Sequence, residues 1–181
     1  MLKKTGPQST KAILALARHS LERHHLPRIE LCLGKLEEKD IWWRPHSSCN
    51  SIGNLVLHLN GNVRQWIVSG LGGQSFRRER DKEFSERRPL PRRQLTAKLK
   101  ATVRAACRLI RKLRPGDLER QYTIQGLRVS GLQALLHVTE HFAFHAGQII
   151  YITKLRLRED LAFTRLPGER QRRRRARLPV L

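Results

Sequence analysis

The chain has 181 residues, of which 29% are charged, and a formal net charge of +22 at pH 7. This length suits one domain with a sizeable core and is short for two domains. No apolar run approaches the ~20 residues of a transmembrane helix, and the start of the chain lacks the apolar core of a signal peptide, so we expect a cytoplasmic protein that does not insert into a membrane.

The positive charge is concentrated in two segments. Residues 165–177 contain seven arginines and one glutamate, and residues 77–93 contain eight lysines and arginines against four acids. Such segments favour polyanions without sequence preference, through the release of counterions. Because composition changes to arginine after Phe163 and no core can be built there, we expect residues 164–181 to form a solvated, disordered tail rather than a selected nucleic-acid site.

Apolar residues in the first part of the chain recur at helical spacing. Between Thr10 and Leu36 they are three or four residues apart, and Pro27 is expected to kink this helix or to restart it. The polar run at residues 46–50 predicts a loop, and Asn50 or Ser51 is expected to cap the next helix. That helix carries one apolar stripe and is expected to stop near the glycines of residues 70–73.

A charged connection then leads to a third predicted helix at residues 91–113. Residues 114–117, Arg-Pro-Gly-Asp, predict a turn, and residues 122–130 predict a short hairpin that bends at Gln125 and Gly126. A fourth helix is expected from about residue 130 to residue 157. Long helices joined in this way predict an all-α four-helix bundle at residues 8–163, with a short hairpin before the last helix.

Histidines on two of these helices are the candidate metal ligands. His141 and His145 lie four residues apart, so both imidazoles project from one helical face, roughly 5–6 Å apart at Cβ. His58 is an isolated imidazole on the apolar second helix. Opposite the pair, it would complete a three-ligand site with an open position, the arrangement typical of catalytic zinc. His137 lies one turn before His141 and is expected beside the site, because one helix cannot easily place three ligands around one ion. The alternative is that all these imidazoles are satisfied by hydrogen bonds alone.

Three stretches of the sequence resemble the DinB-like family. They are Trp42–Pro45 (WWRP), Gly61–Trp66 (GNVRQW) and Glu140–Ile149 (EHFAFHAGQI), and the likeness extends from about Leu26 to Phe163. The resemblance implies a four-helix bundle, often dimeric, in which one histidine of the second helix and an HxxxH pair of the last helix bind a divalent metal. In this sequence those positions are His58, His141 and His145, and the metal would be zinc, nickel or a similar ion.

The resemblance also bears on activity. Characterised relatives are thiol-dependent transferases or isomerases that use low-molecular-weight thiols, so we expect a metal-dependent thiol transferase, or a hydrolase, that acts on a small molecule. Many relatives carry an HHRGQ run, whereas Phe144 and Ala146 flank His145 here. No catalytic residue is named. Glu140 and His137 are candidates for a general base, and Gln148 is a candidate to contact the site.

Two other functions remain open at this point. One is a metal-binding bundle without catalysis, of a stress-related kind. The other is nonspecific nucleic-acid binding through the basic surface and tail, for which the sequence holds no recognition motif. Cys32, Cys49 and Cys107 add neither a disulfide framework nor a cysteine zinc site, because their number is odd and no CxxC spacing occurs.

Overall fold

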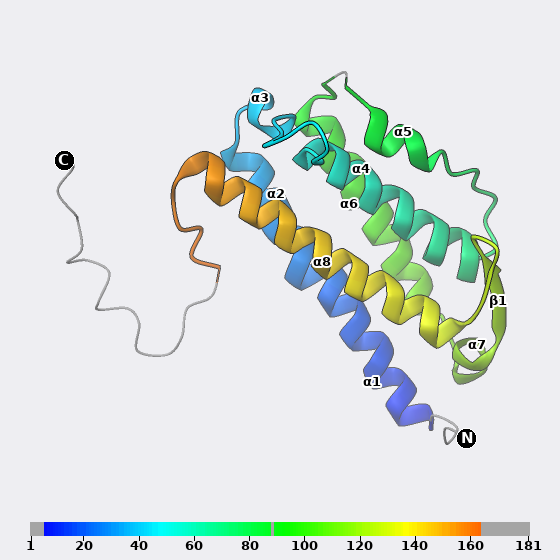
Figure 1. Ribbon diagram of the computed structural model, residues 1–181. Coiled ribbons are helices and arrows are strands. Elements are labelled where there is room, and N and C mark those ends of the chain that lie inside the picture. The colour runs from blue at the N-terminus through cyan, green and yellow to red at the C-terminus, as the bar shows by residue number, and fades with distance from the viewer. Residues whose placement is uncertain (1–5, 88, 164–181) are drawn as a thin grey trace, which may run out of the picture.

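Residues 6–87 and 89–163, which this computed structural model describes, form a bundle of four long helices (Figure 1). The first comprises α1 (Pro7–Arg18), η1 (His19–His25) and α2 (Leu26–Lys35), and the second comprises α4 (Ile52–Val63) and η2 (Arg64–Leu71). The third is α6 (Arg92–Ile110) and the fourth is α8 (Gly131–Leu157). The predicted all-α four-helix bundle is confirmed, and the tail predicted at residues 164–181 lies outside the described residues.

The first long helix is continuous across Pro27, where the sequence predicts a kink or a restart. η1 is a π-helical segment, and the N–H of Leu26 donates to the carbonyl oxygen of Leu21, five residues back. Proline has no N–H for the helical ladder, and its ring crowds the preceding turn. The wider turn accommodates these two effects without ending the helix.

The central helix of the bundle is α4. Ser51 caps its N-terminus, where the hydroxyl oxygen accepts a hydrogen bond of 3.2 Å from the N–H of Asn54, and this confirms one of the two predicted caps. The helix packs against α6 and α8 and is covered by α5 (Arg80–Ser85), so that nearly all its residues are buried (Figure 1). A polar side chain on α4, such as His58, must therefore find its partners inside the protein.

Short elements form the connections. α3 (Glu38–Ile41) follows α2, and the charged connection contains α5. α7 (Pro115–Glu119) stands where the sequence predicts a turn, since Pro115 suits a first helical turn and the Asp117 carboxylate accepts a 2.8 Å bond from the Arg114 N–H. The predicted hairpin is confirmed as β1 (Gln121–Ile124) and β2 (Leu127–Ser130), which pair in antiparallel register. Its bend holds Gln125 at φ 55° and Gly126 at φ 77°, as a tight turn of this kind requires.

The core is mainly aliphatic, with Phe142 of α8 as its largest fully buried side chain. Cys32 and Cys107 belong to this core, Cys49 is half-buried, and all three are free thiols, as their spacing predicts. Burial raises the pKa of Cys32, and it raises the pKa of Cys107 to about 11, so neither is a ready nucleophile. Within the described part of the chain, no helix has the length and apolar character that crossing a bilayer requires.

His25 should make the fold sensitive to acid. It ends η1, and its ring centroid lies 6.3 Å from that of Phe142. Burial, aided by the charges of His24 and Arg28, lowers the pKa of His25 from 6.5 to about 4. Between these pH values the unfolded chain binds the proton and the folded chain does not. The stability contributed by neutral His25 is therefore present above about pH 6.5 and is lost as the pH falls through 4.

We accordingly expect wild type to lose more of its free energy of unfolding between pH 7 and pH 4 than His25→Leu does, as measured by urea denaturation. His46→Leu, in an exposed loop, serves as the control and should follow wild type. Parallel pH profiles for wild type and His25→Leu would contradict this assignment.

Candidate metal centre

Three histidines from two helices meet inside the bundle. His141 and His145 lie one turn apart on α8, and His58 faces them from α4. Ligand nitrogens of the three rings lie within 4.8 Å of one another, and Nε2 of His58 is 2.8 Å from Nε2 of His141. The ring centroids of His141 and His145 each lie 4.9 Å from that of His58. The structure thus brings together the three predicted residues, close enough to share one ion.

Two of these imidazoles are oriented through their outer nitrogens. Nδ1 of His58 is 2.9 Å from a carboxylate oxygen of Glu83, and Nδ1 of His145 is 2.7 Å from Oε1 of Gln148. Because both partner atoms are oxygen acceptors, in the neutral form of each ring Nδ1 carries the proton and Nε2 presents a lone pair. A guanidinium nitrogen of Arg78 also lies 3.1 Å from Nδ1 of His58, but the closer carboxylate decides the tautomer. Bonds of this kind fix the orientation of metal-binding histidines and increase their basicity.

Glu83 is the important residue that sequence reasoning missed. Its side chain is only 11% exposed, and that of Arg78 is 4% exposed. Arg78 binds the carboxylate through two bonds of 2.7 Å, from Nε to Oε1 and from Nη2 to Oε2. Two parallel bonds of this kind form a strong charge-assisted pair. The local sequence shows only acids interspersed in a basic segment, a signal that does not separate a buried acid from an exposed one.

Residues of α4 hold Glu83 in place. The buried side chain of Asn54 donates from Nδ2 to the backbone oxygens of Glu83 at 2.8 Å and Glu86 at 3.2 Å. Its Oδ1 accepts a 2.5 Å bond from Arg44, within the WWRP stretch. At Gly61 a β-carbon would overlap the Glu83 carboxylate, so this glycine lets the acid approach the helix. Stretches that carry the DinB-like resemblance therefore position the acid that orients His58.

The surroundings favour neutral imidazoles and an ionised acid. Burial, followed by the neighbouring imidazoles and Arg78, lowers the pKa of His141 to about 3. Burial also lowers the pKa of His145, although its bond to Gln148 acts in the opposite direction. Burial alone would raise the pKa of Glu83, but the bonds from Arg78 and His58 outweigh it and the net pKa is lowered.

His137 lies beside the three histidines, as the sequence predicts. Its ring packs against Trp66, tilted by 31° with centroids 3.9 Å apart, and stacks on His141 with centroids 5.4 Å apart. Its Nε2 is 3.3 Å from Nδ2 of Asn62. Trp66 is buried. Glu140 is exposed on α8, on the outer side of the helix, and so is poorly placed as a general base. Gln148 contacts the site through His145, a role that the sequence left open.

The fold and the residues at its centre define a DinB-like helical bundle. The chain belongs to the family described as "Protein of unknown function (DUF1572)", whose model matches residues 9–170. A comparison with curated proteins found no match.

Solved structures show the same fold. A DinB-like protein from Bacillus cereus ATCC 10987 is 15% identical, with a TM-score of 0.58, over 74% of this chain and 87% of that chain. A DinB-like protein from Bacillus subtilis is 17% identical, with a TM-score of 0.60, over 82% of this chain and 94% of that chain. A conserved protein from Enterococcus faecalis is 15% identical, with a TM-score of 0.67, over 80% of this chain and 97% of that chain. These matches confirm the resemblance and the fold.

The buried pair of Arg78 and Glu83 should be important for stability. Glu83→Ala leaves the guanidinium of Arg78 inside the protein without its carboxylate, which we expect to lower the free energy of unfolding by about 3–5 kcal/mol. The matched control is Glu79→Ala, since the Glu79 side chain is 59% exposed and its pair with Lys82 lies on the surface; its effect should be within about 0.5 kcal/mol. Urea denaturation of metal-free protein measures both, and similar losses in the two variants would rule out a stabilising role for the buried pair.

Proposed function

We propose that the protein binds one divalent metal ion through His58, His141 and His145, and that it is a metal-dependent enzyme catalysing thiol transfer, or hydrolysis, on a small molecule. One observation carries this proposal. The Nε2 atoms of His58 on α4 and His141 on α8 converge. The outer nitrogens of His58 and His145 are bound by Glu83 and Gln148. The homodimer implied by the resemblance belongs to the same proposal.

The donor set suits such an ion. Nε2 of His58 and Nε2 of His141 are 2.8 Å apart, so at this distance two lone pairs would repel each other unless a proton or a cation lay between them. Imidazole is a good ligand for zinc and nickel, which it binds at about 2.0–2.1 Å. Among the described residues, no other histidine, cysteine or acid joins the cluster, and three protein ligands leave room for a substrate.

The chemistry follows from this ligand set. A divalent ion held by three neutral imidazoles lowers the pKa of a water or thiol that contacts it, and so supplies a nucleophile near neutral pH. The protein's own part is to hold the ligands still and to limit access of water. Glu83 and Gln148 fix the rings of His58 and His145, while Phe84 packs 4.6 Å from the His58 ring, between centroids. A low-molecular-weight thiol is the expected co-substrate.

Elemental analysis of purified protein tests the metal. We expect one zinc, nickel or similar ion per chain in wild type. Metal should be lost in His58→Ala, His141→Ala and His145→Ala, because each change removes one of the three protein ligands. His46→Ala, in the exposed loop, should keep the wild-type content. Unchanged metal content in all three site variants would reject the assignment.

Turnover separates the enzyme from a bundle that only binds metal. Metal-loaded wild type should transfer small thiols such as glutathione or cysteine to an electrophile, or hydrolyse an ester, and His141→Ala should not. A fully loaded protein that turns over none of these substrates would favour a binding protein without catalysis.

Gly61 offers a second test of the centre that leaves every ligand in place. In Gly61→Ala the new methyl group must displace the Glu83 carboxylate, so the outer bond to His58 is lost. Loss of such a bond weakens metal binding by about 10- to 100-fold. Gly34→Ala is the matched control, because a β-carbon at Gly34 has nothing within 4 Å, and competition with a fluorescent chelator measures both affinities. Wild-type affinity in Gly61→Ala would show that Glu83 does not support the metal.

A further inference from the structure

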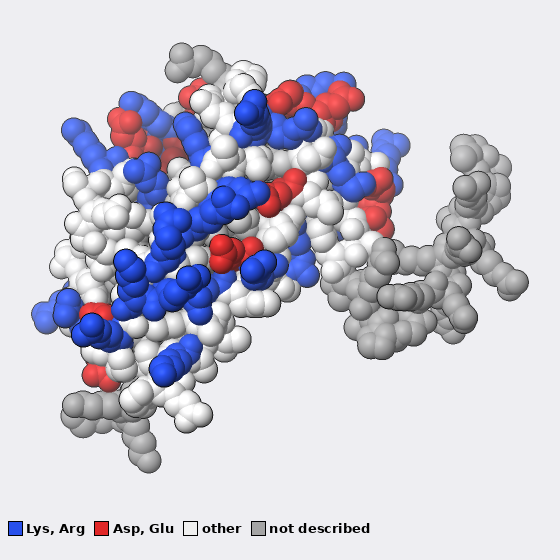
Figure 2. All heavy atoms as spheres, turned by 180° about the vertical axis from the view of Figure 1, so that it is seen from behind, with Lys and Arg blue, Asp and Glu red and all other residues white. Residues whose placement is uncertain are grey.

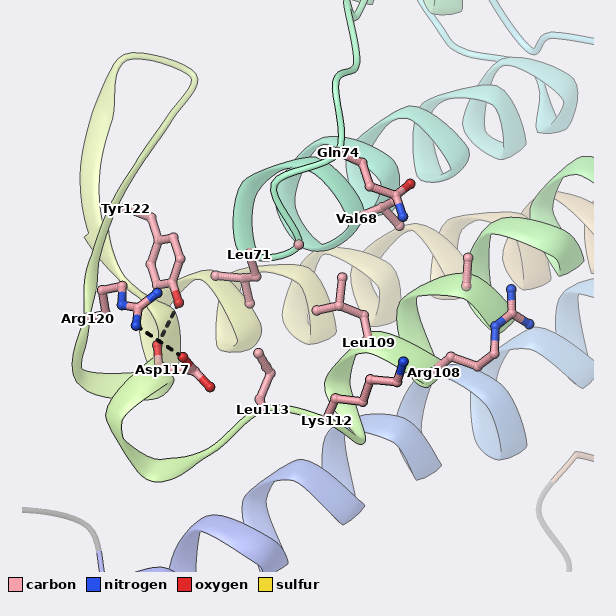
Figure 3. A pocket seen from close by; sticks show the side chains of 12 residues that line it. Val68, Leu71, Gln74, Arg108, Leu109, Lys112, Leu113, Asp117, Arg120 and Tyr122 are labelled. Atoms are coloured by element: carbon pink, nitrogen blue, oxygen red, sulfur yellow. Dashed lines mark hydrogen bonds and ion pairs between the residues drawn. The ribbon is translucent and has the colours of Figure 1, made fainter.

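A pocket of about 440 Å³ lies between η2 and α6, away from the three histidines (Figure 3). Its floor is apolar and consists of Val68 and Leu71 from one side and Leu109 and Leu113 from the other. Tyr122, at the start of the hairpin, bounds one end, as Figure 3 shows. The volume falls in the range of about 300–1,000 Å³ that is usual for small-molecule sites.

Cations stand at the edge of this pocket. Arg108 on α6 and Lys112 in the turn that follows this helix are both exposed, and Arg120 lies next to Tyr122. Neither Arg108 nor Lys112 has a carboxylate partner among the residues that the structure describes. Asp117 also lines the pocket, but its carboxylate already accepts a 2.8 Å bond from the Arg114 N–H and lies 3.6 Å from Arg120. Two positive charges are therefore available to a ligand.

The pocket lies on a broader basic face. Between Arg92 and Ile110, α6 contains no aspartate or glutamate, and its exposed side also carries Arg93, Lys98 and Arg104. Figure 2, the view from behind, shows lysines and arginines gathered in a band on this side of the molecule. A second pocket of about 390 Å³ shares Val68, Gln74 and Ala105 with the first, so the two form one groove along α6.

We propose that this groove binds a small amphiphilic anion, in which a carboxylate or phosphate group is attached to an apolar chain or ring. Arg108 and Lys112 would bind the acid group, and the leucines of the floor would cover the apolar part. A polynucleotide fits less well, because single strands are bound by stacking of bases on aromatic rings. Among the described residues, Tyr122 is the only aromatic one in the pocket lining, and its hydroxyl group already donates a 3.2 Å bond to the Asp117 carbonyl oxygen.

Calorimetric titration of the full-length protein with octyl phosphate, below its micellar concentration, tests the proposal. We expect one site per chain, with octanol binding at least about tenfold more weakly because it lacks the charge. Arg108→Gln/Lys112→Gln should weaken octyl phosphate binding by about tenfold or more. Arg104→Gln/Arg111→Gln is the matched control, since it removes the same charge from α6 and the turn after it, at positions outside the groove.

Filling the groove should abolish ligand binding even when the charge of the protein is unchanged. Ala105 lines both parts of the groove, so Ala105→Trp should fill it and abolish binding while circular dichroism shows the wild-type helix content. His58→Ala should bind octyl phosphate as wild type does, so this test and the metal test can fail separately. Equal weakening by the two double variants, or equal binding of octanol, would overturn the proposal. The proposal would also be overturned, in favour of nucleic acid, if a twelve-residue oligothymidylate bound more tightly than octyl phosphate and both double variants weakened its binding alike.

Discussion

The buried network of His58, Glu83 and Arg78 is the interaction on which the rest of the centre depends. A charge inside a protein costs several kcal/mol unless it is paired, so neither Glu83 nor Arg78 would remain buried without the other. α5, which carries the acid, contributes no residue to the hydrophobic core and is held by polar bonds to Asn54 and to His58. The bonds that hold α5 on α4 therefore also fix the ring of His58.

Much of the fold could be predicted because its determinants are local. Helical spacing of apolar residues marks the long helices, and Gln125 with Gly126 marks the bend of the hairpin. The pair of His141 and His145 is also a local feature, since the geometry of one helix places both rings on one face. Placing His58 opposite them is different, because that contact joins positions 83 residues apart, and no periodic pattern specifies it. There the family resemblance supplied what the spacing could not.

The features that escaped prediction depend on packing between distant segments. In the sequence Glu83 looks like Glu79, one turn earlier in the same charged segment, yet only Glu83 is buried. What separates them lies on α4, where Gly61 leaves room for a carboxylate and Asn54 binds the backbone beside it. Pro27 is a similar case, because its local effect is to break a helix, whereas contacts of both halves with α6 and α8 keep the helix continuous through a wider turn.

Charge connects the two proposed sites. The formal net charge of the chain is +22, and the carboxylate nearest to the histidine cluster, that of Glu83, is already balanced by Arg78. A cation bound by neutral imidazoles would therefore keep its full charge, in a protein whose field also attracts anions. The same reasoning applies to the groove along α6, where Arg108 and Lys112 form no ion pair among the described residues. Both sites should consequently select ligands that carry negative charge, a thiolate at one and an amphiphilic acid at the other. Glu83 binds the outer nitrogen of His58 and so leaves the inner nitrogen of that ring, Nε2, free to bind the ion.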